Sequence, residues 1–128
     1  MNLYHATYRN LIPSIEQHGL GGGTSGKEWT DSKRGVVYLA VDPCVAESYA
    51  EANEDVPEEW VDDIVVFGVK LDSLDRSKLF IDENVLDNDG ATVEYHGIIP
   101  YSCLFEVDLY NYDAEDAEIE DFIDSLKA

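Results

Sequence analysis

Short apolar segments of strand length, separated by turn residues, constrain the fold of this chain most strongly. The clearest runs from Gly35 to Val41, is rich in β-branched and aromatic residues, and follows a polar stretch. Similar segments recur towards the end of the chain, where apolar residues alternate with polar ones. The pattern predicts strands at residues 3–7, 35–41, 64–69, 78–81, 92–96 and 103–109.

Helical signals occur mainly in the first half of the chain. Asn10 is a candidate N-cap for a helix that continues through Ile15, and Gly19 supplies its end. Asp42 followed by Pro43 is a strong signal for the start of a second helix. The buried face of this second helix is predicted to consist of Val45, Ala46, Tyr49 and Ala50.

Length and element order favour one α+β domain. A chain of 128 residues with 45% hydrophobic residues can build a single hydrophobic core. Helices come early and most strands late, which favours α+β over a doubly wound sheet. Ile119, Phe122 and Leu126 recur at helical spacing on an acidic background. We therefore divide the chain into a domain over residues 1–112 and an acidic amphipathic C-terminal helix over residues 113–128.

The chain is strongly acidic, with 28 acidic and 8 basic residues and a formal net charge of −20. This charge disfavours nucleic acid as a partner, because affinity for a phosphate backbone rests largely on Lys and Arg. Solubility is the simplest interpretation of the acidity. A second interpretation is a surface that docks on a basic protein or imitates nucleic acid, and charge alone does not separate the two.

The sequence also indicates a compartment. No stretch approaches the roughly 18 apolar residues of a membrane span, and the first residues lack the pattern of a signal peptide. Cys44 and Cys103 each lie within an apolar pattern, which favours buried free thiols over a disulfide. We therefore expect a cytoplasmic protein. His18 and His96 are isolated in the sequence, and no spacing of His, Cys, Asp and Glu indicates a metal site.

Three segments carry candidate chemistry. They are Leu3-Tyr4-His5-Ala6-Thr7 with the following Gly19-Leu20, Val36-Val37-Tyr38-Leu39 with the following Ala46, Tyr49 and Ala50, and Glu94-Tyr95-His96-Gly97-Ile98-Ile99-Pro100. Their order and spacing resemble the motifs of small ADP-ribosyltransferases, including the DNA-modifying toxin branch. In that family a strand-borne H-x-T, a strand tyrosine with an A-x-x-Y-A helix, and a strand glutamate with an I-P turn follow one another. The resemblance covers roughly residues 3–107 in patches, and implies a split mixed or antiparallel β core with flanking helices.

The resemblance implies a site for NAD, which would be a substrate. His5 would hydrogen-bond the adenosine-side ribose with support from Thr7, since an imidazole can donate and accept at once. Tyr38 would stack on the cationic nicotinamide ring. Glu94 would bind the nicotinamide ribose and stabilise positive charge at its anomeric carbon. The other residues expected to bind NAD are Ala6, Arg9, Lys33, Arg34 and Tyr49.

Basic residues cluster where a dinucleotide pyrophosphate would need hydrogen-bond donors. Arg9 lies beside the first motif, and Lys27, Lys33 and Arg34 lie in the loop before the second. The three proposed catalytic residues also have purely structural explanations. A histidine or tyrosine on an apolar strand is commonly a core residue, and alternation can turn Glu94 to solvent.

The sequence departs from the family at Thr92, which stands two residues before Glu94 where arginine-directed transferases have a second glutamate. This departure disfavours arginine as the acceptor. The expected function is NAD-dependent mono-ADP-ribosyl transfer by a bacterial or phage toxin or effector to a protein or small-molecule acceptor. Two alternatives stay open: a catalytically inactive acidic module that binds or inhibits a basic protein surface, and an NAD glycohydrolase with water as acceptor.

Overall fold

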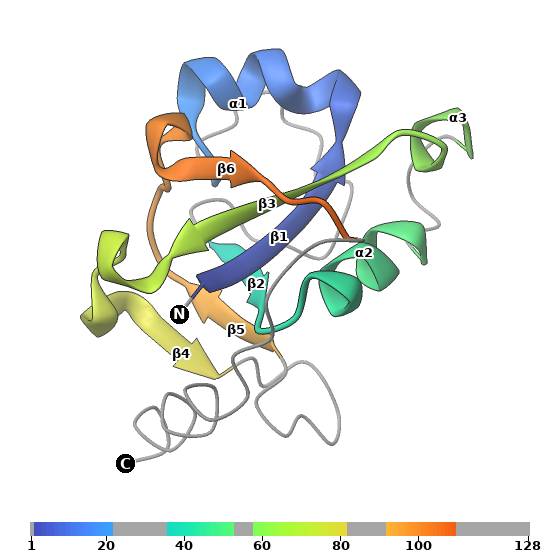
Figure 1. Cartoon of the computed structure of the whole chain (residues 1–128). Coiled ribbons are helices and arrows are strands. Elements are labelled where there is room, and N and C mark those ends of the chain that lie inside the picture. Colours follow the sequence, from blue (N-terminus) through green and yellow to red (C-terminus); the bar gives the residue numbers. More distant parts are fainter. Residues whose placement is uncertain (1, 22–35, 53–57, 82–91, 110–128) are drawn as a thin grey trace.

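A computed structural model describes residues 2–21, 36–52, 58–81 and 92–109 of the chain. These residues form a six-stranded sheet with the strand order β4-β5-β2-β1-β3-β6, in which all neighbouring strands are antiparallel (Figure 1). The strands are β1 (Asn2–Tyr8), β2 (Val37–Ala40), β3 (Ile64–Lys70), β4 (Leu79–Ile81), β5 (Thr92–Tyr95) and β6 (Leu104–Glu106). The helices are α1 (Ile12–His18), α2 (Pro43–Glu51) and the single turn α3 (Glu58–Val61). The predicted α+β class is therefore confirmed, with an antiparallel sheet.

Alternation along the strands creates a different core on each face of the sheet. The larger core joins Leu3 of β1 to Ile15 of α1. Its strand members are Leu3, Val37, Leu39, Val65, Phe67, Val69, Leu79, Val93 and Tyr95. On the opposite face, a smaller core packs against Ala46 of α2. Its strand members are Tyr4, Ala40 and Val66. Helix α2 thus lies along β1 and β3 (Figure 1), and the two helices cover opposite faces.

Helix α2 begins as its sequence predicts, whereas α1 does not. An Asp42 Oδ1 accepts a hydrogen bond of 2.7 Å from the Cys44 backbone N–H, and Pro43 occupies the first turn. Asn10 lies inside a 3₁₀ turn, and the N-cap of α1 is Leu11 without a side-chain bond. The prediction that Asn10 is the N-cap was wrong. The Arg9 backbone N–H donates a hydrogen bond of 3.0 Å to the Asp63 oxygen, just before β3, so strand-like pairing continues up to the residue before Asn10. The turn therefore follows the strand directly.

Two burial predictions on α2 were also wrong. Tyr49 is 50% exposed, and the free thiol of Cys44 is exposed. The helix turns Pro43, Ala46 and Ala50 towards the sheet, and their spacing leaves positions 44 and 49 outside that buried stripe. Cys103 is also a free thiol and is partly buried.

The prediction for the C-terminal segment concerns residues that the structure does not describe. The amphipathic helix expected at residues 113–128 lies outside the described part of the chain. Within the described ranges, no helix combines the length and apolar character needed to cross a membrane.

Candidate functional site

Tyr38 and Glu94 lie directly opposite each other on β2 and β5. Directly opposed residues on antiparallel strands point to the same face, with their Cβ atoms about 4.5–5.5 Å apart. Phe80 of β4 is the next residue in this row, because it pairs with Glu94 from the other side. The Glu94 side chain is 19% exposed, so the row presents a largely buried carboxylate between two aromatic rings.

Regular pairing between β1 and β2 is short. The two strands pair only at Tyr4 and Ala40, whereas β1 pairs with β3 along its full length. Nδ1 of His5 lies 2.8 Å from the backbone oxygen of Tyr38. A side chain therefore links the two strands where backbone pairing has ended. Backbone pairing between β1 and β2 is therefore limited to one residue pair, although both strands belong to the same six-stranded sheet.

The protonation of His5 follows from its partner. A carbonyl oxygen can only accept, so Nδ1 of His5 carries the proton and donates it to Tyr38. Burial lowers the pKa of His5 below its ordinary value of 6.5, and the bond to the Tyr38 carbonyl opposes this effect without reversing it. The imidazole is thus neutral at neutral pH, and its Nε2 can accept a hydrogen bond.

His5 does not share a sheet face with the other two residues. Extension of the Tyr4–Ala40 register places Ala6 opposite Tyr38, so His5 belongs to the alternate face of β1. Thr7 shares that face with His5 and is buried. Ala6 is partly buried against the α2 core. His5 therefore reaches Tyr38 through the backbone oxygen of β2.

Sequence reasoning missed His96. Nε2 of His96 lies 3.1 Å from Oε2 of Glu94. The His96 ring packs against Phe80 with a centroid distance of 4.7 Å, and its backbone N–H donates to the Lys78 oxygen at 2.8 Å. A signal was available, since residues two apart on a strand share a face. The E-x-H spacing from Glu94 to His96 could have indicated this contact.

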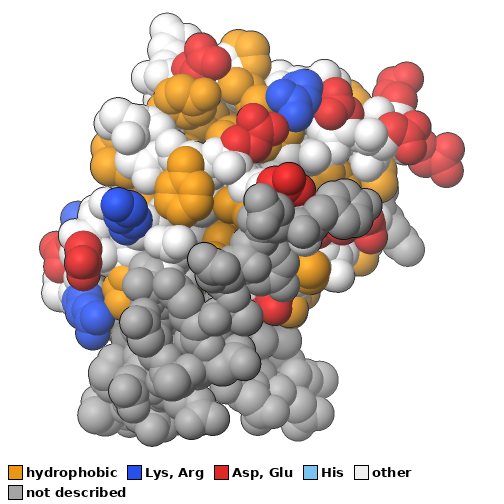
Figure 2. Space-filling view, viewed as in Figure 1, with side chains coloured by type: hydrophobic (Ala, Val, Ile, Leu, Met, Phe, Trp, Pro, Cys, Tyr) orange, Lys and Arg blue, Asp and Glu red, His pale blue; other side chains and the backbone are white. Residues whose placement is uncertain are grey.

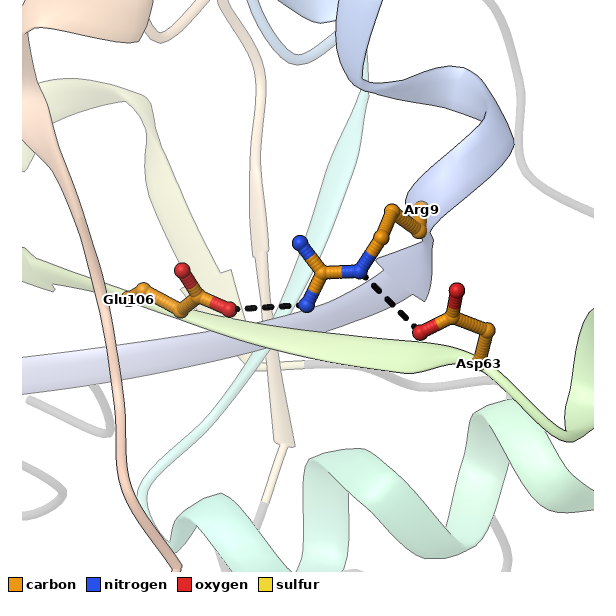
Figure 3. A network of polar contacts seen from close by, with 3 residues as sticks. All are labelled: Arg9, Asp63 and Glu106. Carbon is orange, nitrogen blue, oxygen red and sulfur yellow. Dashed lines mark hydrogen bonds and ion pairs between the residues drawn. The ribbon is translucent and has the colours of Figure 1, made fainter.

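Arg9 has other partners than the sequence predicts (Figure 3). Its Nε lies 3.0 Å from Asp63 Oδ1, and its Nη2 lies 3.0 Å from Glu106 Oε1. These two carboxylates raise the pKa of Arg9. Asp63 precedes β3 and Glu106 lies on β6, so the guanidinium faces the side of β1 opposite to β2. The structure therefore places Arg9 apart from the row of Tyr38 and Glu94.

Of the remaining residues predicted to bind NAD, Tyr49 lies on the exposed side of α2. Lys27, Lys33 and Arg34 lie outside the described residues.

The ends of the first and third motifs meet in space. Leu20 and Ile99 exchange two backbone hydrogen bonds, of 2.8 and 3.0 Å. Gly19 has a φ of +76°, and a Cβ atom there would lie 2.6 Å from the Ile99 oxygen. The G-L segment after α1 and the I-P segment after β5 therefore form one contact, and it requires glycine at position 19.

Comparison of the chain with protein-family models, curated proteins and solved structures finds no match. Among the described residues, no group of three or more His, Cys, Asp and Glu side chains is positioned to hold a metal ion. A function for this protein is therefore inferred from the arrangement of its own residues.

Proposed function

We propose that this protein is an NAD-dependent ADP-ribosyltransferase of the toxin or effector type that modifies a protein or small-molecule acceptor. One arrangement carries the proposal. Tyr38 stands directly opposite Glu94, and its carbonyl accepts a hydrogen bond from His5. Residues taken from three separate sequence motifs thus occupy three adjacent strands, β1, β2 and β5.

The neighbouring positions of Tyr38 and Glu94 suit the two halves of a nicotinamide riboside. A cationic nicotinamide ring favours an aromatic face, which Tyr38 offers. The ribose attached to that ring would then lie beside the Glu94 carboxylate. As the bond from the ribose to nicotinamide lengthens, positive charge develops at the anomeric carbon, and a largely buried carboxylate stabilises it.

The state of His5 suits the other end of the dinucleotide. Its Nδ1–H is used by the Tyr38 carbonyl, so Nε2 would accept a hydrogen bond from a hydroxyl of the adenosine ribose. A bent NAD molecule would lie along the interruption between β1 and β2, with His5 and Glu94 on its two sides. Arg9 is not needed for this arrangement, because two carboxylates already hold it.

The test is NAD binding and turnover in the variant Glu94→Gln. We expect this variant to bind NAD like the wild type, measured as a thermal shift, because the amide keeps the size of the side chain. Release of nicotinamide should fall on the order of a hundredfold or more, since the electrostatic contact to the transition state is lost. His5→Ala should lose the thermal shift itself.

Glu106→Gln is the matched control, because Glu106 is an exposed carboxylate on the edge strand β6, which three strands separate from β5 and Glu94. Its turnover should equal that of the wild type. Unchanged nicotinamide release by Glu94→Gln would contradict the proposed role of Glu94. Labelled ADP-ribose that stays in solution, with none on a macromolecule, would identify an NAD glycohydrolase.

The charge supports a second candidate, an inactive acidic module that binds a basic protein. The net charge is −20, and acidic side chains occupy several parts of the visible face in Figure 2. Opposite charge on a partner would speed association and select the partner. This candidate predicts no thermal shift with NAD, and a protein partner that dissociates at high salt.

A further inference from the structure

A carboxylate and an imidazole form a pair at the C-terminal end of β5. Oε2 of Glu94 on β5 and Nε2 of His96, the residue that follows β5 directly, are 3.1 Å apart. Their exposure differs, with 19% for the Glu94 side chain and 47% for that of His96. The pair therefore has one largely buried member and one member that solvent and a second reactant can reach.

The chemistry of the pair fixes the proton on His96. A carboxylate only accepts, so Nε2 of His96 is the donor. In the neutral imidazole, Nδ1 then carries a lone pair. The described residues give Nδ1 no hydrogen-bond partner. Contact with the Phe80 ring and the backbone bond to Lys78 hold the imidazole in place.

This arrangement matches a general base that a carboxylate orients. In such pairs the carboxylate fixes the tautomer, stabilises the imidazolium that forms, and leaves the far nitrogen to take a proton. Glu94 alone would have to stabilise the ribose cation and deprotonate the acceptor in the same step. An adjacent imidazole removes this conflict.

We propose that His96 is a further catalytic residue, the base that deprotonates the acceptor while Glu94 stabilises the ribose. This inference rests on the proposed transfer from NAD. In the step, the bond between C1′ of the ribose and the nicotinamide nitrogen breaks, and its electron pair stays on nicotinamide. A lone pair of the acceptor forms the new bond to C1′. The acceptor's proton passes to Nδ1 of His96 and then to water.

The experiment compares nicotinamide release from NAD by the wild type, His96→Gln and Glu94→Gln, first in water and then with sodium azide. Glutamine can still donate to Glu94 but has no basic nitrogen. We expect His96→Gln to bind NAD like the wild type and to release nicotinamide about a hundredfold more slowly, the usual scale for loss of a general base. Azide needs no deprotonation, so it should restore the rate of His96→Gln and yield azido-ADP-ribose. It should not restore Glu94→Gln.

His18→Gln is the matched control, since His18 ends α1, and its rate should not change. Release by His96→Gln at the wild-type rate in water, or no recovery with azide, would overturn the role of His96 and leave the proposed function standing. A wild type that neither binds nor cleaves NAD would instead overturn the proposed function, and the role of His96 with it.

Discussion

The contact between Gly19 and Ile99 offers the sharpest test of the fold around the site, through the variant Gly19→Ala. Gly19 has φ +76° and ψ 175°, a conformation that only glycine adopts readily, and other residues there cost about 1–3 kcal/mol. The added Cβ would also lie 2.6 Å from the backbone oxygen of Ile99, which accepts the hydrogen bond from Leu20. Loss of that bond adds about 1 kcal/mol. We therefore expect the free energy of unfolding to fall by roughly 2–4 kcal/mol.

Urea denaturation followed by circular dichroism measures this change, and a thermal scan should show a midpoint lower by on the order of 10 °C. Gln17→Ala is the control, because Gln17 is exposed on α1 two residues before Gly19. Its free energy of unfolding should stay within about 0.5 kcal/mol of the wild type. A loss below about 0.5 kcal/mol in Gly19→Ala would refute the reasoning, since it would mean that the left-handed glycine and its contact with Ile99 do not constrain the fold.

Two further predictions concern polar side chains of β1. The Tyr8 hydroxyl donates a buried hydrogen bond of 2.8 Å to the Ala50 oxygen. Tyr8→Phe should therefore lower the free energy of unfolding, measured by urea denaturation, by about 1–2 kcal/mol. An unchanged free energy would show that this bond does not help to hold α2 on β1. Burial lowers the pKa of His5 in the folded state, so the unfolded chain takes up this proton first as the pH falls below 6.5. Above pH 6.5, His5 is neutral in both states and does not reduce the free energy of unfolding. As the pH falls from 6.5 towards the lower pKa of the folded state, the unfolded chain is protonated first and the free energy of unfolding decreases. Unfolding free energies measured across that window should depend less on pH in His5→Gln, and equal slopes for the two proteins would contradict the lowered pKa.

Local signals predicted much of the fold. Asp42 and Pro43 start α2 because the cap and the fixed φ of proline act within one turn. Gly19 ends α1 for an equally local reason. Each strand lies within or overlaps a predicted apolar segment, because strands packed in a sheet bury apolar, β-branched and aromatic side chains on one or both faces.

The misses involve contacts between distant parts of the chain. Arg9 forms ion pairs with Asp63 and Glu106, which are 54 and 97 residues away in the sequence. No local pattern around Arg9 predicts these partners. The apolar spacing of α2 predicts that Tyr49 is buried, yet the rotation of α2 on the sheet depends on small residues that only the tertiary packing selects. The position of Tyr38 opposite Glu94 likewise depends on strand register, which the sequence alone does not define.

Strand alternation explains why the proposed NAD site would need an interrupted sheet. In a continuous sheet, His5 would lie on the face opposite to Tyr38 and Glu94, and no single ligand could touch all three side chains. The carbonyl of Tyr38, however, lies in the plane of the sheet, and the His5 imidazole reaches it beside the point where pairing between β1 and β2 ends. In the proposed function, NAD placed at this interruption would meet residues of both faces. On the proposed function, this interruption would bring three residues on three strands into one site, and restoring regular pairing between β1 and β2 should abolish NAD binding even with His5, Tyr38 and Glu94 intact.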